Sequence, residues 1–193
     1  MIKKSHFQEK EPILESFLSY FRAKKVVKYI PQNSRVLDLG CGYNGFFLKN
    51  NRNKIMGGIG IDISVNKNNS DSRIKLINHD LNLGLPFKEN FFDAVVSLAN
   101  LEHLENPIQN LHEIYRVLKS GGILLLTTPT IYAKPALEFL SFRLKLISEE
   151  GVRDHKNYFN KEWLVNTLKD AGFSFIKHHY FQLFMNNFVY ARK

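Results

Sequence analysis

Glycines and carboxylates gather where apolar stretches of this 193-residue chain end, and they are the residues best suited to bind a ligand. Asp38 comes just before a turn that holds Gly40 and Gly42, and Gly45 follows. Glycines let the backbone approach a ligand closely, and a helix that begins after such a turn presents free N–H groups to it. Asp62 ends the next apolar stretch, where a carboxylate can accept hydrogen bonds from both hydroxyls of a ribose. Taken alone, this is a weak nucleotide-binding pattern.

Three features turn this pattern away from a nicotinamide dinucleotide. A carboxylate at Asp38, under the glycine turn, would repel a pyrophosphate, whereas an amino or sulfonium group would gain a charge-assisted contact. Asp80 ends a third apolar stretch and could accept from the exocyclic amine of an adenine. The two Tyr-x-x-x-Lys pairs, which begin at Tyr20 and Tyr115, do not follow a strand, so no hydride-transfer set is expected. An NAD-dependent oxidoreductase is therefore disfavoured.

An alternation of strands and helices must position these residues. Short apolar runs predict strands over 35–39, 55–63, 74–78, 92–98 and 123–128, with a closing strand pair over 173–181 and 188–191. Apolar stripes at helical spacing, with caps at Asn106 and Asn160, predict helices over 12–30, 106–118, 133–148 and 160–172. Strands separated by helices indicate an α/β protein whose mostly parallel sheet is covered on both faces. In such sheets ligands bind at the carboxyl ends of the strands.

Length and composition fit one domain over residues 1–193, with an N-terminal helical cap over 1–31 and a substrate-lid insertion over 129–160. The single cysteine, Cys41, excludes an intramolecular disulfide and a multi-cysteine metal cluster. No apolar run reaches the ~18 residues that span a bilayer, and the first residues lack the apolar core of a secretory leader. We therefore expect a cytoplasmic protein without stable membrane insertion. The net charge of +9 either favours anionic partners or reflects a lysine-rich surface.

Six blocks of sequence follow one another between residues 35 and 128: Val36–Gly42, Gly60–Ser64, Asp80 with Leu85–Phe87, Phe91–Ser97, Leu101–Leu104 and Leu118–Gly122. In this order and spacing they resemble the class I S-adenosylmethionine-dependent methyltransferases. The resemblance is to the small-molecule branch, which is similar to the ubiquinone and menaquinone methylases. It implies a Rossmann-like, doubly wound, seven-stranded, mostly parallel sheet with an antiparallel C-terminal strand pair.

The resemblance also implies S-adenosylmethionine as the cofactor, with S-adenosylhomocysteine as its product. The residues that it assigns to cofactor binding are Asp38, Gly40, Cys41, Gly42, Asp62, Ile63, Asp80, Leu81, Leu98 and Ala99. Asp38 would lie near the amino group of the methionine part, Asp62 would bind the ribose, and Asp80 would accept from the adenine amine. The third glycine of the family stands here at Gly45, one residue after the usual position, which Asn44 occupies. Because asparagine tolerates positive φ, we expect the turn to survive this shift.

The residues that would act on the methyl acceptor are His103, His155 and Tyr158. His103 follows the fourth strand and is a candidate general base, because its ordinary pKa suits neutral pH; the alternative is a structural turn. His155 and Tyr158 belong to the charged stretch 153–159, which is either a substrate-recognising lid or an ordinary charged loop. The other histidines lack companions at metal-ligand spacing, so no metal site is expected.

We therefore predict an enzyme, an S-adenosylmethionine-dependent methyltransferase that acts on a small polar or anionic metabolite, such as a sugar or cell-envelope precursor. Amino-methylating DNA enzymes carry an Asp/Asn-Pro-Pro-aromatic turn where this chain has Ser97–Asn100, so nucleic acid is disfavoured as a partner. Two alternatives stay open: an RNA methyltransferase that uses the basic surface, and a cofactor-binding regulatory protein without turnover. The residues do not predict the oligomeric state.

Overall fold

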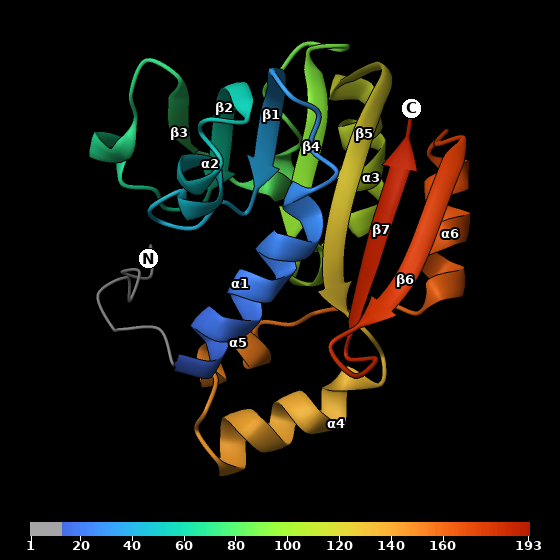
Figure 1. The fold of residues 1–193 in the computed structure, drawn as a ribbon. Helices are drawn as coiled ribbons and strands as arrows, with labels where there is room; N and C mark the ends of the chain where they lie inside the picture. The colour runs from blue at the N-terminus through green and yellow to red at the C-terminus, as the bar shows by residue number, and fades with distance from the viewer. Residues whose placement is uncertain (1–12) are drawn as a thin grey trace.

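Seven strands form one sheet in the computed structural model, which describes residues 13–193 (Figure 1). The strands are β1 Ser34–Leu39, β2 Ile55–Asp62, β3 Ile74–Asn78, β4 Phe92–Leu98, β5 Leu118–Pro129, β6 Phe175–Phe181 and β7 Asn186–Arg192. Their order is β3-β2-β1-β4-β5-β7-β6; β7 runs antiparallel to both neighbours, and the other pairs are parallel. The predicted architecture is confirmed. The strand order reverses between β1 and β4, where ligands of such sheets bind.

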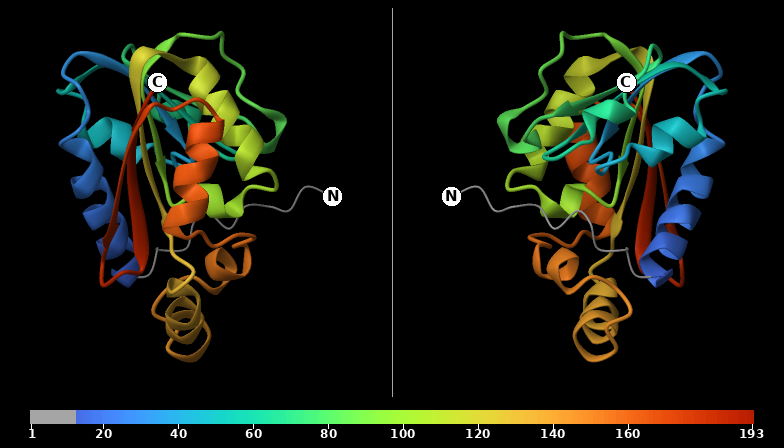
Figure 2. Two further views of the ribbon diagram at one scale, coloured as in Figure 1. Left: turned by 90° about the vertical axis from the view of Figure 1, so that its right-hand side faces the viewer. Right: turned by 90° about the vertical axis from the view of Figure 1, so that its left-hand side faces the viewer.

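Helices cover both faces of the sheet (Figure 2). The helices α1 Ile13–Val27 and α2 Phe46–Asn50 pack on one face, and α3 Pro107–Val117 and α6 Lys161–Asp170 pack on the other. A hydrophobic core lies on each face of the sheet. Successive residues of a strand belong alternately to the two cores, as Val36 and Leu37 do in β1. Because both faces are covered, the central strands are apolar throughout rather than alternating.

Side-chain caps begin the helices where the sequence predicts them. The side chain of Asn106 accepts a hydrogen bond from the N–H of Gln109, and that of Asn160 accepts one from the N–H of Trp163. Gly45 precedes α2 with a φ of 61°, so the left-handed position at the start of this helix is occupied by Gly45 rather than by Asn44. Three 3₁₀ turns complete the strand ends: η1 Lys67–Asn69, η2 Leu81–Leu83 and η3 Leu101–His103.

The helix predicted over 133–148 is wrong as a single α-helix. It consists of α4 Ala133–Glu138 and a π-helical turn, η4 Phe139–Arg143, and a separate helix, α5 Glu149–Arg153, follows. Lys145 has a φ of 51°, which ends the helical path. Ser148 then begins α5, because its hydroxyl accepts from the N–H of Gly151 at 3.0 Å. An apolar stripe at helical spacing cannot distinguish one helix from two that share a face.

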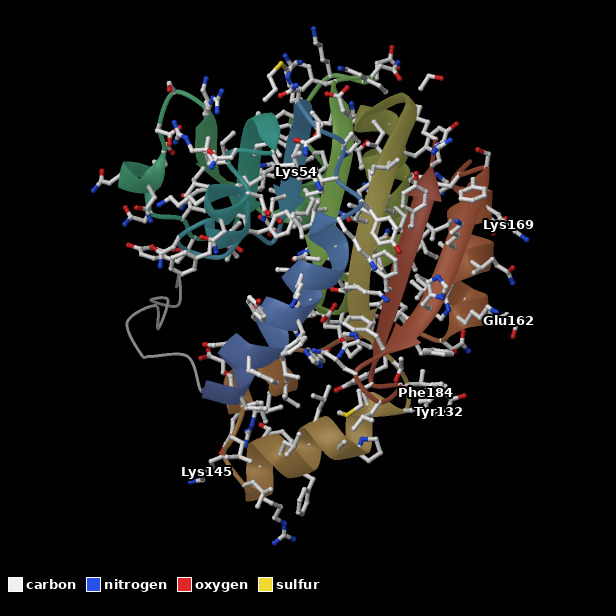
Figure 3. All side chains as sticks on the ribbon, viewed as in Figure 1. Lys54, Tyr132, Lys145, Glu162, Lys169 and Phe184 are labelled. Atoms are coloured by element: carbon white, nitrogen blue, oxygen red, sulfur yellow. The ribbon has the colours of Figure 1, made fainter. Side chains whose placement is uncertain are left out.

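Exposed apolar side chains gather at the end of the molecule where β5 and β6 finish. Tyr132 and Phe184 are each 65% exposed and lie in this region (Figure 3). Leu183, in the turn between β6 and β7, is 92% exposed. None of the helices within residues 13–193 combines the length and the apolar character needed to cross a bilayer. Residues 1–12, the first part of the predicted helical cap, lie outside the described residues.

Candidate active site

The turn after β1 is held against the end of β2 by its own backbone. The N–H groups of Gly40 and Cys41 donate to the carbonyl of Ile61, at 2.9 and 3.1 Å. The N–H of Gly42 donates to Oδ2 of Asp62 at 2.9 Å. The carboxylate predicted to bind a ribose therefore lies directly beside the turn predicted to line the methionine part, as adjacent parallel strand ends require.

Two buried polar atoms beside this turn have no hydrogen-bond partner among the described residues, Oδ2 of Asp38 and Nδ2 of Asn100. Asp38 is 2% exposed, and burial, together with repulsion from Asp62, raises its pKa to about 7. An ammonium group would satisfy the oxygen of Asp38, and a carboxylate would satisfy the donor of Asn100. The two atoms therefore fit the amino-acid part of S-adenosylmethionine.

The part of the site that is predicted to bind adenosine is more exposed than the part around Asp38. Ile63, directly after β2, is 72% exposed, whereas Leu81 is 7% exposed. Oδ1 of Asp80 accepts from the N–H and the side-chain amide of Asn82, at 2.9 and 3.0 Å, which leaves Oδ2 for a further donor. The ends of β1 to β4 are adjacent in the sheet, so the fold brings the ten predicted cofactor residues to one edge. Their contacts with a cofactor stay a prediction.

A cavity of about 330 Å³ adjoins this edge at the end of β4. Leu98 and Ala99, which belong to the predicted cofactor set, also line the cavity. Its remaining apolar wall comes mainly from α1, from the stretch 129–152 and from the β6–β7 turn: Leu14, Leu18, Leu137, Leu140, Ile147 and Leu183. The predicted helical cap and the predicted lid segment therefore both face one space. Their opening and closing stay a prediction.

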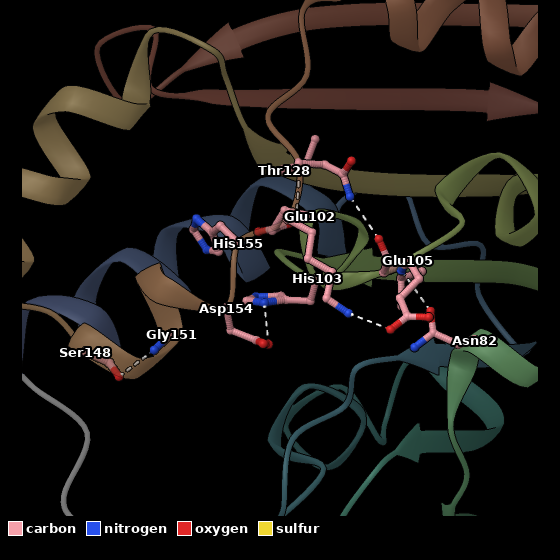
Figure 4. Close-up of polar contacts among 12 residues, drawn as sticks. Asn82, Glu102, His103, Glu105, Thr128, Ser148, Gly151, Asp154 and His155 are labelled. Carbon is pink, nitrogen blue, oxygen red and sulfur yellow. Dashed lines mark hydrogen bonds and ion pairs between the residues drawn. The ribbon is translucent and has the colours of Figure 1, made fainter.

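Glu102, His103 and His155 form an ionisable wall of the cavity (Figure 4). Arg22 of α1 lines the same cavity. Glu102 is 1% exposed and accepts from the hydroxyl of Thr128 at 2.9 Å through Oε2. Nδ1 of His103 lies 3.1 Å from Oδ2 of Asp154. The fold thus brings the two predicted histidines together, with their ring centres 4.9 Å apart.

Burial sets the charge of this wall. It raises the pKa of Glu102 above its ordinary value, against a smaller opposing effect from His103. Burial, helped by His103, lowers the pKa of His155 to about 4, so this imidazole is neutral at neutral pH. Tyr158 does not line the cavity; its hydroxyl lies 3.1 Å from Nδ1 of His155 and so orients that ring. Its predicted role toward an acceptor stays a prediction.

No pattern in the sequence marks Glu102 as a functional residue, although the structure places it at the centre of this wall. Its partner Thr128 lies near the end of β5, 26 residues further along the chain, so the pair has no local signal. Arg22, one of the residues behind the net charge of +9, also lines the cavity from α1. The proximity of His155 to Glu102 and His103 also has no signal in the sequence.

Comparison with known proteins places these features in context. A family model described as a methyltransferase domain matches residues 9–178. The tRNA (carboxymethyluridine(34)-5-O)-methyltransferase of Arabidopsis thaliana is 32% identical over 114 residues, which are 58% of this chain and 28% of that protein. The ubiquinone/menaquinone biosynthesis C-methyltransferase UbiE of Neisseria meningitidis serogroup C is 34% identical over 112 residues, 49% of this chain and 44% of that protein.

The fold is shared with solved structures at lower identity. A chain in the complex of the Haloferax volcanii Trm112 methyltransferase activator with a methyltransferase superposes with a TM-score of 0.75 at 18% identity, covering 92% of this chain and 91% of that one. The chain spans about half or less of the length of the curated relatives that it matches. The family model nevertheless covers β1 to β5, and so it includes the strand ends that form the candidate cofactor site. The chain belongs to the class I S-adenosylmethionine-dependent methyltransferase family.

Proposed function

We propose that this chain transfers a methyl group from S-adenosylmethionine to an acceptor held in the cavity beside Leu98 and Ala99. The observation that carries the proposal is the pair of orphaned buried atoms on Asp38 and Asn100, next to the glycine turn. S-adenosylmethionine, when bound, supplies a methyl group already activated on a sulfonium. The chain itself has to align the acceptor, exclude water and accept any proton that the acceptor loses.

On the cofactor side, we assign Asp38 to the ammonium group and Asn100 to the carboxylate of the methionine part. Asp62 takes the ribose hydroxyls. Its orientation is already fixed, because Oδ2 accepts from the N–H of Gly42 at 2.9 Å and Oδ1 accepts from the N–H of Ser64 at 3.3 Å. Each carboxylate oxygen keeps a second lone pair for a ligand hydroxyl.

On the acceptor side, we assign His103 and His155 to the methyl-accepting atom. Both line the cavity next to Ala99, which belongs to the predicted cofactor set. Tyr158 is a positioning residue in this proposal, because it acts through the ring of His155. The lid role of 129–160 belongs to the same proposal and is supported by the side chains of Leu137, Leu140 and Ile147 on the cavity wall.

The cavity lining narrows the acceptor class. Most of the wall is aliphatic, and the ionisable groups cluster at one end, near Glu102, His103 and His155. Such a site favours a small molecule with an apolar body and one polar, methyl-accepting end over a molecule that is polar throughout. A cell-envelope precursor with an apolar part belongs to this class, whereas a free sugar does not match the aliphatic wall.

Calorimetry with S-adenosylhomocysteine tests the cofactor half of the proposal. We expect Asp62→Ala to weaken binding by about 1–3 kcal/mol, the cost of losing hydrogen bonds to a charged group. Asp170→Ala, at the exposed end of α6, is the matched control and should leave the affinity unchanged. Absence of heat with both forms of the cofactor on folded protein would overturn the proposal. An unchanged affinity of Asp62→Ala would overturn the ribose assignment.

RNA is a second candidate acceptor, favoured by the similarity to the Arabidopsis tRNA methyltransferase and by the net charge of +9. Incubation of the chain and labelled S-adenosylmethionine with a small-molecule fraction and an RNA fraction separates the two. The leading proposal expects label in small molecules at any salt concentration. Label in RNA that falls steeply as salt rises would favour the second candidate. Cofactor affinity without label in either fraction would favour the regulatory alternative.

A further inference from the structure

Three metal-ligand side chains converge on the acceptor cavity. Glu102 and His103 end the short η3 turn, and His155 comes from the stretch after α5 (Figure 4). One potential ligand atom from each lies within 4.8 Å of the others, which makes a set of two imidazoles and one carboxylate. Both histidines lie on the cavity wall, so an ion held there would face the acceptor.

Each ligand of this set is held by a second partner that leaves a lone pair for an ion. Nδ1 of His103 donates to the carboxylate of Asp154, so Nε2 carries the free lone pair. Nδ1 of His155 meets the hydroxyl of Tyr158 at 3.1 Å, and the tautomer that donates to Tyr158 again leaves Nε2 free. A ring nitrogen bonded to a carboxylate or hydroxyl while the other faces an ion is the usual second-shell arrangement of metal-binding histidines.

The carboxylate of Glu102 is the independent observation that points to a ligand. Oε2 accepts from the hydroxyl of Thr128 at 2.9 Å, but Oε1 is buried and has no hydrogen-bond partner within residues 13–193. A buried carboxylate oxygen without a partner costs folding free energy unless a cation satisfies it. Arg22 lines the same cavity, but its guanidinium does not donate a hydrogen bond to Oε1 of Glu102.

We propose that Glu102, His103 and His155 bind one divalent transition-metal ion whose open positions face the acceptor cavity. Metal bonds of about 2.1 Å place neighbouring ligand atoms about 3 Å apart, so the three side chains would rotate inward when the ion binds. Glu102 can make this movement because only one of its two carboxylate oxygens, Oε2, has a hydrogen-bond partner. Both histidines can make it because their Nε2 atoms keep a free lone pair. The ion would hold an oxygen or nitrogen atom of the acceptor, and this part of the inference rests on the proposed function.

The ligand types select the class of ion. Imidazole suits the divalent ions from Fe²⁺ and Co²⁺ to Zn²⁺, and Mn²⁺ binds most weakly in this series. Two imidazoles with one carboxylate form the facial set that leaves positions open for a substrate. Mg²⁺ and Ca²⁺ prefer sets made of oxygen atoms, which this wall lacks among the described residues. We therefore expect Mn²⁺, Co²⁺ and Zn²⁺ to bind, and Mg²⁺ to compete poorly.

Titration of the full chain, after removal of metal with a chelator, tests the site directly. Co²⁺ should bind at one ion per chain, with a ligand-field spectrum that Zn²⁺ bleaches and Mg²⁺ does not. Glu102→Gln and His155→Gln should each weaken the binding of Co²⁺ more than about tenfold, and Asp154→Asn, which removes a second-shell partner, about tenfold. His112→Gln, on the exposed face of α3, is the matched control and should bind as the original chain does.

S-adenosylhomocysteine affinity is measured on the same samples and separates the two claims. If the chain binds S-adenosylhomocysteine but takes up no Co²⁺, Mn²⁺ or Zn²⁺, the metal site is overturned and the proposed function stands. If Co²⁺ binds but His112→Gln weakens it as much as His155→Gln does, the assignment of the ligands is overturned. If the original chain does not bind S-adenosylhomocysteine, this result counts against the proposed function instead. Should Glu102→Gln not fold, His155→Gln decides.

Discussion

At the scale of single residues, the buried carboxylate of Asp38 links protonation to both folding and ligand binding. Its pKa is raised from 3.8 to about 7, chiefly by burial and further by repulsion from Asp62. Between those values the folded chain keeps a proton that the unfolded chain has released. This group therefore contributes stability that is fully present below pH 3.8 and is lost as the pH rises through about 7.

We predict that Asp38→Asn changes the pH dependence of unfolding. Relative to the original chain, the variant should gain about 1–4 kcal/mol of unfolding free energy between acidic and neutral pH, because it carries no proton to lose. Urea denaturation at a series of pH values measures this difference. A constant difference between the two chains at every pH would contradict the elevated pKa.

The residue scale also shows what the sequence can reveal. Asp38 and Asp62 could be predicted because each lies at the carboxyl end of a strand, and these ends of a parallel sheet meet at one edge. Glu102 could not, because its burial depends on Thr128 at the far end of β5. The closeness of His103 and His155 likewise depends on how the stretch after α5 returns to the sheet.

At the scale of elements, the turn between β1 and α2 works only with very little side-chain volume. Gly40 has a φ of 71°, and a Cβ at this position would lie 2.5 Å from Oδ1 of Asn100. The turn and the residue that follows Ala99 are therefore in direct contact. Asn100 directly follows Ala99 of the cavity wall, so a larger residue at position 40 would displace a side chain next to that wall.

We predict that Gly40→Ala lowers the unfolding free energy and weakens S-adenosylhomocysteine binding at least about tenfold. The left-handed φ alone costs about 1–2 kcal/mol, and the contact with Asn100 adds to it. Gly121→Ala is the control, because Gly121 has a φ of 74° but no atom within 4 Å of an added Cβ. The control should lose unfolding free energy because of its backbone conformation, but its affinity for S-adenosylhomocysteine should stay unchanged. Equal losses of affinity in both variants would contradict the contact.

Elements with local signals could be predicted, and those that depend on distant packing could not. The caps at Asn106 and Asn160 act within one turn of their helices, so the sequence shows where these helices begin. The apolar spacing of 133–148 is helical throughout and therefore predicts one helix. Ser148 followed by two glutamates is the signal of a new helix start that the stripe concealed.

At the scale of the whole molecule, the acceptor cavity is assembled from chain segments that meet only through the fold. The amide of Gln182, in the β6–β7 turn, donates to the carbonyl of Leu18 in α1 at 3.3 Å. Alternation of strands and helices predicts a mostly parallel sheet covered on both faces, and the family resemblance predicts its seven strands and its doubly wound order. No local pattern predicts that α1 and the stretch 129–155 close over the same space.

We predict that these cavity walls open more readily than the sheet. Phe139, Phe142 and Leu144 expose much of their surface, whereas β4 is covered on both sides. Segments with little buried apolar contact open locally at a lower free energy. Hydrogen exchange followed by mass spectrometry should show amides of 135–152 exchanging at least about tenfold faster than those of β4. Equal protection of both would contradict a lid in this segment.

The reversed direction of β7 has a practical consequence for handling the protein. Its last residue pairs with Ile123, at the amino edge of the parallel strands, whereas the glycine turn and the cavity lie at the opposite edge (Figure 1). Attachment of the chain to a sensor surface through a tether at Lys193 would point the binding mouth toward the flowing solution. Immobilised samples are thus suited to screening acceptors without obstruction by the support.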